Sequence, residues 1–381
     1  MTGMKITSVK PFPVKVGRRA SLFVKVYTDE GVTGVGESGL WGRELAVAEA
    51  VRSAELLLIG QDPSRIDHLW QTMFRGTFWR GGPVLGSAIS AIDIALWDLN
   101  AKALGVPVHR LLGGKSRDRV RCYAHLGDVD RETMVERAKE FVAEGWTVVR
   151  FAVLQDMATG VIEPGPAIRR CVGDTAAVRA AVGEDVDIVI DFHVRLNPNY
   201  AIELGRALEP YHPFFLEDPI RAENPGSYRQ VREHVNLPIA TGEHLVGKWE
   251  FRALVEEDLI NYARPDLCVF GGLTEAKKLA SWCETHYIDM APHNPLGPVS
   301  TAACLALCTA VPNFGVLELS WRPGGMSEVI KGAPRLEGGY LIPSDEPGLG
   351  VDLDEDACEE YPFERWELKH LRRADGSFTD W

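Results

Sequence analysis

Eight short apolar segments recur through the middle of the chain, and most of the gaps between them can hold a helix. Each segment is apolar enough to be covered on both faces, as the strands of a parallel sheet are. Eight such strands over about 200 residues favour a (β/α)₈ barrel over an open doubly wound sheet. The segments are residues 119–123, 147–152, 187–191, 214–217, 238–241, 260–264, 289–292 and 315–319.

The region before the barrel has strand signals first and helical signals after them. Residues 5–16, 22–28 and 32–37 carry the β-branched residues of a three-stranded meander, with an acidic turn at Asp29 to Gly31. Apolar residues then recur at helical spacing. The expected helices cover residues 43–59, 63–74 and 88–104.

This order, strands followed by helices without alternation, is typical of a separate α+β unit. The predicted fold is therefore of the α/β class, a modified (β/α)₈ TIM barrel with an N-terminal α+β capping domain. We place the capping domain at residues 1–117 and the barrel at residues 118–321. The tail, residues 322–381, is rich in Gly, Pro and aromatic residues. We expect it to pack back on the capping domain and complete it.

Charge and composition exclude several kinds of partner. The net charge of -13 over 381 residues argues against nucleic acid, because phosphate binding needs a basic surface. An acidic protein can still act on an anionic small molecule if a metal ion reverses the local field. No apolar run approaches the ~20 residues that cross a bilayer, and residues 1–17 lack a signal-peptide pattern. We therefore expect no membrane partner and a cytoplasmic protein whose seven cysteines are reduced core thiols.

Three carboxylates end three successive strand segments. The active site of a parallel barrel lies at the carboxyl ends of its strands. The intervals from Asp191 to Glu217 and from Glu217 to Glu243 are both 26 residues, about one βα unit. A single acid at a strand end is more often a helix cap or a surface ion pair, but three at one rim would repel each other without a hard cation. Ligation by oxygen alone selects Mg²⁺ over zinc.

Two histidines and two further acids end segments at the same rim. His193 follows Asp191 by two residues, so an extended chain would return its side chain to the same face. Asp266 and His293 end neighbouring segments, and a carboxylate bonded to one imidazole nitrogen makes the other more basic. Glu318 ends the last segment. His244, beside a predicted ligand, is expected to point away.

Three residues are candidates for substrate binding. Arg150 ends the second segment and could hold a substrate oxygen or pair with a neighbouring carboxylate, and the sequence leaves both roles open. Trp79 and Arg80 lie in the segment FWRGGP, which could close over the substrate or form an ordinary turn.

Motifs along nearly the whole chain resemble the mandelate racemase branch of the enolase superfamily. Within that branch the chain is similar to D-galactonate dehydratases. The resemblance implies Mg²⁺ held by Asp191, Glu217 and Glu243 and a symmetric homo-oligomer, an octamer among the assemblies it suggests. The motifs are TDEGVTGVGE, GQDPSRIDHLW, FWRGGP, SAIDIALWDLNAKALGVPV, DFH, LEDP, TGEH, PDL, GGLTEA, APHNPLGP and the terminal DW.

The same resemblance implies roles for the remaining rim residues. His293 with Asp266 would take the proton next to the carboxylate of a sugar acid, and His193 would protonate the departing hydroxyl. Glu318 would hydrogen-bond the enediolate, and the product would be a 2-keto-3-deoxy sugar acid.

The chain departs from the galactonate dehydratase pattern at the second strand. A Lys and an Asn are expected there, and Arg150 and Ala152 stand in their places. The arginine, with LEDPIRAEN, EEDLINYAR and VPNFG, is similar to D-mannonate dehydratases. Those enzymes use a tyrosine in the following loop, but residues 154–173 contain none, and this chain keeps Asp266 where they lack the acid. The sugar acid could therefore be of galactonate, gluconate or mannonate type.

Two other functions are compatible with the fold. Racemases, epimerases and cycloisomerases use the same enediolate chemistry but usually need a second base, and Arg150 is a poor base because it stays protonated. A catalytically silent member of the superfamily is the other alternative, since a fold does not guarantee an activity.

Overall fold

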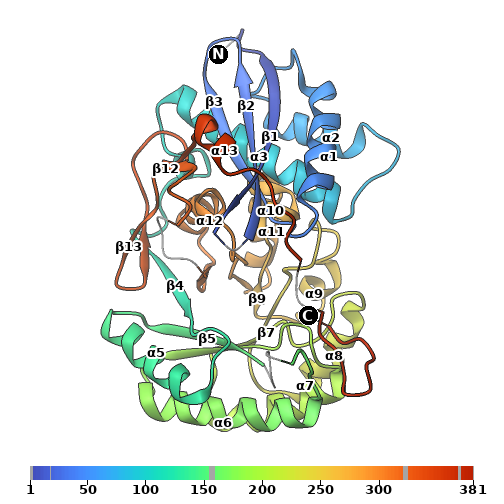
Figure 1. Ribbon diagram of the computed structural model, residues 1–381, viewed down its shortest axis with the longest axis vertical. Helices are drawn as coiled ribbons and strands as arrows, with labels where there is room; N and C mark the ends of the chain where they lie inside the picture. The colour runs from blue at the N-terminus through green and yellow to red at the C-terminus, as the bar shows by residue number, and fades with distance from the viewer. Residues whose placement is uncertain (1–2, 18, 154–158, 321–324, 368–369, 381) are drawn as a thin grey trace.

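A computed structural model describes residues 3–17, 19–153, 159–320, 325–367 and 370–380. The molecule consists of an α+β cap and a barrel below it (Figure 1). The N-terminus lies at the far end of the cap, and the C-terminus lies beside the barrel.

The cap is built on an antiparallel sheet in the order β1-β2-β3. Three helices follow the strands along the chain, as the sequence predicts. The third, α3, begins at Pro83, five residues before the expected start, because proline suits the first turn of a helix. The elements are β1 (Ile6–Val16), β2 (Arg19–Thr28), β3 (Thr33–Ser38), α1 (Glu44–Leu58), α2 (Ile66–Arg75), α3 (Pro83–Leu104) and the short α4 (Val108–Leu111).

Helix α3 is long and apolar enough to cross a bilayer, with a mean hydropathy of 1.3 over its most apolar window. However, 83% of that window is buried inside the fold. The helix packs against β3 and β2 on one side and against the barrel helices α10 and α11 on the other. Its apolar character is therefore that of a core helix joining the cap to the barrel.

The barrel has eight parallel strands, one in each predicted segment. Neighbouring strands pair in chain order, and the last strand pairs with the first through Leu317 and Cys122. A bridge between Met290 and Phe314 joins the seventh strand to the eighth and closes the barrel. The strands are β4 (Val120–His125), β5 (Val148–Ala152), β6 (Asp187–Asp191), β7 (Phe215–Glu217), β8 (Ile239–Thr241), β9 (Tyr262–Ala263), β10 (Asp289–Met290) and β11 (Leu317–Leu319).

Helices surround this barrel, and α5, α6 and α7 lie along the side away from the cap (Figure 1). Side chains from different strands fill the interior and form a core of their own around Tyr123 and Phe215, so the barrel has no central pore. The helices are α5 (Arg131–Ala143), α6 (Pro164–Val182), α7 (Pro198–Leu208), α8 (Tyr228–His234), α9 (Arg252–Glu256), α10 (Leu267–Phe270), α11 (Gly272–Glu284) and α12 (Pro298–Ala310), with single 3₁₀ turns at Glu209–Tyr211 and Pro225–Ser227.

The C-terminal segment contacts both parts of the molecule. In the cap, Lys25 forms an ion pair with Glu355 at 3.0 Å, and Val14 pairs with Pro362. Further along, Arg372 pairs with Val161 of the barrel, so the end of the chain leaves the cap. The expected boundary at residues 321 and 322 falls outside the described residues. The elements of this segment are β12 (Ile330–Lys331), β13 (Arg335–Glu337), β14 (Tyr340–Ile342), β15 (Asp352–Leu353) and α13 (Glu355–Glu360).

Candidate active site

The predicted rim residues meet at the carboxyl ends of the barrel strands. Asp191 ends β6 directly opposite Glu217, which ends β7. Glu243 follows β8, and its side chain is 6% exposed, whereas Asp191 and Glu217 are fully buried. Buried carboxylates need compensating partners, so the identity of those partners defines the site.

Two of the three predicted metal ligands belong to one tight acidic group. One carboxylate oxygen each from Glu217, Asp218 and Glu243 lies within 4.8 Å of the other two. Burial raises the pKa of Glu217 to about 7, although Arg264 and Arg150 oppose this, and it raises the pKa of Asp218 to about 6. The fold thus holds together carboxylates that repel one another.

Asp191, the third predicted ligand, has other partners within the structure. Its Oδ2 accepts a short hydrogen bond from Arg150 Nη2, and its Oδ1 accepts one from the backbone N–H of His193 at 2.6 Å. Arg150 Nε also lies 3.6 Å from Glu217 Oε1. Of the two roles left open for Arg150, the structure therefore contains the ion pair with neighbouring carboxylates.

Arg264 lies at the centre of the acidic residues and was not among the site residues predicted from the sequence. It is fully buried, and its Nη2 lies 3.0 Å from Glu217 Oε1, 3.1 Å from Glu318 Oε2 and 3.4 Å from Glu243 Oε2. Its Nη1 donates to the hydroxyl of Tyr123 at 2.9 Å, and that hydroxyl donates to Glu217 Oε2 at 3.1 Å. One guanidinium therefore neutralises part of the charge of several carboxylates.

His293 and Asp266 form the predicted pair. His293 Nδ1 lies 2.8 Å from Asp266 Oδ2, and Nε2 lies 3.5 Å from Glu243 Oε2. Burial alone lowers the pKa of this imidazole, but Glu243, then Glu318 and Asp266 outweigh burial and raise the pKa to about 10. One nitrogen is thus fixed by Asp266 while the other faces the acidic group.

Glu318 is held from two sides. His125 Nε2 lies 3.0 Å from its Oε1, and the backbone N–H of Asn294 donates to its Oε2 at 3.0 Å. Burial, followed by the charge of Arg150, lowers the pKa of His125 below its usual value. His125 was also missed, because β4 extends to His125, two residues beyond the predicted segment 119–123.

His193 reaches the site by a different route from the expected one. The extended geometry assumed for residues 191–193 is wrong, because β6 ends at Asp191 and both His193 and Val194 have positive φ, at 50° and 53°. Such conformations are strained for residues other than glycine and gather at functional sites. Burial alone raises the pKa of Glu243, but nearby imidazoles, His293 first and His193 among them, hold it well below its usual range.

Trp79 and Arg80 lie elsewhere. Their loop extends from the outer side of the cap (Figure 1), and the two residues line a recess formed by residues of α1, α2 and α3 and the loop between α2 and α3. Trp79 is 80% exposed and stands edge-on to Phe78. The recess does not belong to the barrel rim. The loop that follows the second barrel strand includes residues 154–158, which lie outside the described residues.

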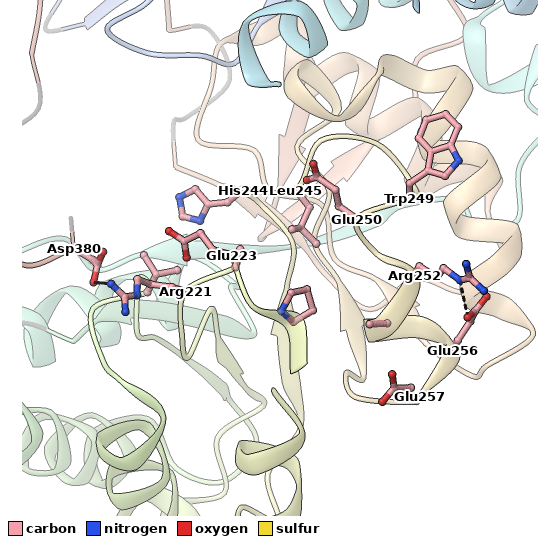
Figure 2. Close-up of a pocket in the computed structure, with 14 residues that line it drawn as sticks. Arg221, Glu223, His244, Leu245, Trp249, Glu250, Arg252, Glu256, Glu257 and Asp380 are labelled. Carbon is pink, nitrogen blue, oxygen red and sulfur yellow. Dashed lines mark hydrogen bonds and ion pairs between the residues drawn. The ribbon is translucent and has the colours of Figure 1, made fainter. Parts of the chain in front are cut away.

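A cavity of about 950 Å³ opens beside β7 and β8 (Figure 2). Figure 2 shows His244, Glu223 and the ion pair between Arg221 and Asp380 on one side of it, and Trp249 on the other. His244 is half exposed there, with Nε2 3.9 Å from Glu243 Oε1, so it lies between the cavity and the acidic group. The residues lining the cavity do not include the His293–Asp266 pair.

The acidic group fits a divalent metal ion. Its donors are carboxylate oxygens, the ligands that Mg²⁺ prefers. Among the described residues, no hydrogen bond reaches the buried Oε1 of Glu217. Its nearest partners are the guanidinium groups of Arg264, with Nη2 at 3.0 Å, and Arg150, with Nε at 3.6 Å, which pair with it by charge; a metal ion is another cation that such a buried acceptor can take.

The fold and the rim define a class of protein, a capped (β/α)₈ barrel whose acidic centre lies beside a paired histidine. Family models match most of the chain. The mandelate racemase / muconate lactonizing enzyme N-terminal domain matches residues 4–113, and the enolase C-terminal domain-like family matches residues 133–357. The chain belongs to the mandelate racemase and muconate lactonizing enzyme family of the enolase superfamily.

Relatives and solved structures agree with this assignment. A D-galactonate dehydratase of Ralstonia pickettii is 40% identical and aligns over 94% of this chain and 96% of its own. A D-mannonate dehydratase of a Caulobacter species is 36% identical over 99% of this chain and all of its own. The crystal structure of an enolase from Pantoea ananatis with bound D-gluconate and magnesium has a TM-score of 0.93 at 31% identity, covering 99% of this chain and all of that one.

Proposed function

We propose that this protein is a magnesium-dependent dehydratase that converts a sugar acid to a 2-keto-3-deoxy sugar acid. The observation that carries the proposal is the His293 imidazole, held by Asp266 on one side and facing the acidic group on the other. This arrangement suits removal of a proton next to a carboxylate that is itself bound beside the acids.

Asp191, Glu217 and Glu243 are the proposed magnesium ligands. Glu217 and Glu243 are already grouped, and Asp191 lies opposite Glu217 across the β6–β7 pair. For Asp191 to join them, Arg150 must give up its ion pair, and an oxygen of the substrate offers the guanidinium a new partner. A magnesium ion bound there supplies positive charge where the enediolate forms, which lowers the barrier to proton loss.

The side chains around the metal site carry out the proton transfers and hold the enediolate. His293 takes the proton from C2, and the C2–H electron pair enters the enediolate. His193 gives a proton to the C3 hydroxyl, which leaves as water, and the resulting enol relaxes to the 2-keto acid. Glu318, held by His125 and Asn294, is the proposed hydrogen-bonding group for the enediolate, to which it donates when it carries a proton.

The substrate class is an aldonate. Dehydratases named for galactonate and for mannonate align over nearly the whole chain, and a structure with bound gluconate shares the fold. Arg150, together with the loop after β5, is the proposed source of discrimination between these sugars.

A screen of mono- and diacid sugars with Mg²⁺, scored for 2-keto-3-deoxy product, tests the proposal. Turnover of at least one aldonate, abolished by His293→Asn and by chelation of the metal, is the expected result. Turnover of galactonate alone would indicate a galactonate dehydratase. Turnover of mannonate or gluconate would indicate that the enzyme acts on one of those sugar acids instead. No product from any sugar acid contradicts dehydration, whereas interconversion of stereoisomers without loss of water indicates an epimerase or racemase.

A cytoplasmic homo-oligomer completes the proposal. All seven cysteines are buried and free, as expected of reduced core thiols. Light scattering coupled to size-exclusion chromatography tests the assembly, with an octamer as the expected outcome and a monomer as the contrary one.

A further inference from the structure

Glu37 lies at the end of β3 in the cap, yet its carboxylate binds the barrel. The side chain is buried, its Oε1 accepts a hydrogen bond from the N–H of Gly297 at 2.7 Å, and its Oε2 accepts one from the N–H of Ser300 at 2.9 Å. Both donors belong to the start of α12, which follows the loop that carries His293. A residue of the capping domain thus accepts hydrogen bonds from N–H groups at the start of α12 that have no partner within the helix.

A buried chain of hydrogen bonds continues from this contact to the proposed active site. Ser300 Oγ donates to Asn294 Oδ1 at 2.8 Å. Asn294 in turn donates its backbone N–H to Glu318 Oε2 at 3.0 Å and its Nδ2 to the Glu318 carbonyl at 3.1 Å. Because Asn294 directly follows His293, the chain fixes the backbone next to the proposed base.

The cap also touches the other member of the pair. The N–H of Gly39 donates to the carbonyl of Cys268 at 3.1 Å. A Cβ at Gly39 would lie 3.0 and 3.1 Å from the carboxylate oxygens of Asp266, closer than ordinary contact. Glu37 therefore contacts the helix start that is linked to His293, and Gly39, two residues further along the same cap segment, lies against Asp266.

We propose that Glu37 is a positioning residue for the base: acting through Ser300 and Asn294, it aligns His293 with Asp266 when the cap is docked on the barrel. The inference rests on the proposed function only in taking His293 as the base. It gives the buried acid at this joint a role beyond satisfying the two N–H groups of α12, which an apolar residue would leave without a partner.

Asp93 provides a matched control. Like Glu37 it is a buried acid of the cap that binds the start of a barrel helix, since its Oδ2 accepts a hydrogen bond from the N–H of Thr274 at 3.0 Å. Burial raises the pKa of both carboxylates to about 7. The helix that Asp93 holds, α11, begins at Gly272, beyond Asp266 and before His293. A purely structural role predicts similar effects at the two positions.

Kinetics of Glu37→Gln, Ser300→Ala and Asp93→Asn distinguish the two accounts. Misplacement of a reacting group by about 1 Å can lower a rate about 100-fold, so we expect kcat to fall about 10- to 100-fold in the first two variants. KM should stay near its normal value, and the isotope effect with substrate deuterated at C2 should rise. Asp93→Asn should keep kcat. Ser300→Ala retains the backbone contact to Glu37 and removes the hydroxyl that bonds Asn294, so it tests the chain even if Glu37→Gln folds poorly.

A measurement without substrate separates this inference from the proposed function. The ring nitrogens of His293 can be followed by NMR in protein labelled at histidine and assigned with His293→Asn. We expect its signals to move in Glu37→Gln and Ser300→Ala and to stay in place in Asp93→Asn, whether or not any sugar acid is turned over. Unchanged His293 signals in the first two variants, or equal movement in all three, would overturn the proposal.

Discussion

His293 Nδ1 and Asp266 Oδ2 lie 2.8 Å apart, on side chains that come from adjacent strand ends of the barrel. The backbone supports the contact, because these two residues also form an isolated parallel bridge. The imidazole is therefore fixed in orientation before any substrate binds, which is what a general base requires.

Replacing His293 by asparagine removes the basic nitrogen and keeps a similar shape. General bases contribute typically about 10²- to 10⁴-fold, so we expect His293→Asn to lower turnover by at least about 100-fold. Calorimetry should show Mg²⁺ still binding, because the carboxylate ligands are untouched. Full activity in this variant would refute the assignment of His293 as the base.

Asp266→Asn should change the pH profile. The carboxylates around His293, Glu243 first and then Glu318 and Asp266, raise the pKa of the imidazole, and only the neutral ring accepts a proton. A metal ion bound by Glu243 would offset the first of these contributions and leave that of Asp266. Activity therefore falls as the pH drops below that pKa. Removal of the Asp266 charge lowers the pKa, so the acid limb of kcat/KM should move to lower pH. An acid limb that stays in place or moves upward contradicts this role.

Arg150→Ala should strengthen metal binding while weakening substrate binding. Arg150 pairs with Asp191, and a cation competes with the guanidinium for that carboxylate. We expect Mg²⁺ affinity to rise about tenfold, equivalent to about 1.4 kcal/mol, and KM for the sugar acid to rise.

Arg121→Ala is the control for this experiment. Arg121 pairs at 2.8 Å with Asp187, at the other end of the same strand β6, so its loss should leave Mg²⁺ affinity unchanged. Equal effects of the two substitutions would mean that overall charge, rather than competition for Asp191, controls metal binding.

The sequence predicts the barrel and the rim well because both depend on local patterns. Seven of the eight strands lie within the predicted apolar segments, and β4 extends two residues beyond its segment; the strand-end rule located Glu217, Glu243 and the His293–Asp266 pair. The sequence left open whether Arg150 binds the substrate or pairs with a neighbouring carboxylate, because an ion pair depends on side-chain conformation. Arg264 was missed although it ends a predicted segment, and His125 was missed because it lies two residues beyond the end of one.

The cap was harder to connect with the site. FWRGGP has the composition of a loop, but composition does not indicate which way the loop turns, and Trp79 is 80% exposed beside a recess of the cap helices. No pattern in the sequence indicates that Glu37 contacts the barrel, because its partners are N–H groups 260 and 263 residues further along the chain.

Stability should fall as the pH rises toward neutrality, and Asp93 should be one cause. Burial raises the pKa of Asp93 from 3.8 to about 7, so the folded protein holds a proton that the unfolded chain releases. The stabilisation is complete below about pH 4 and is lost as the pH rises through about 7, by an amount on the order of 4 kcal/mol. Asp93→Asn should flatten the dependence of the urea midpoint between pH 5 and 8. An unchanged slope contradicts the prediction.

Anomalous scattering from a crystal soaked with Mn²⁺ and an aldonate locates the metal ion and its ligands. We expect one ion bound by the carboxylates of Asp191, Glu217 and Glu243, with Arg150 turned from Asp191 to the sugar acid and His193 and His293 on opposite sides of it. An ion held by Glu217, Asp218 and Glu243 while Asp191 keeps its pair with Arg150, or no ion at this rim, would contradict this expectation.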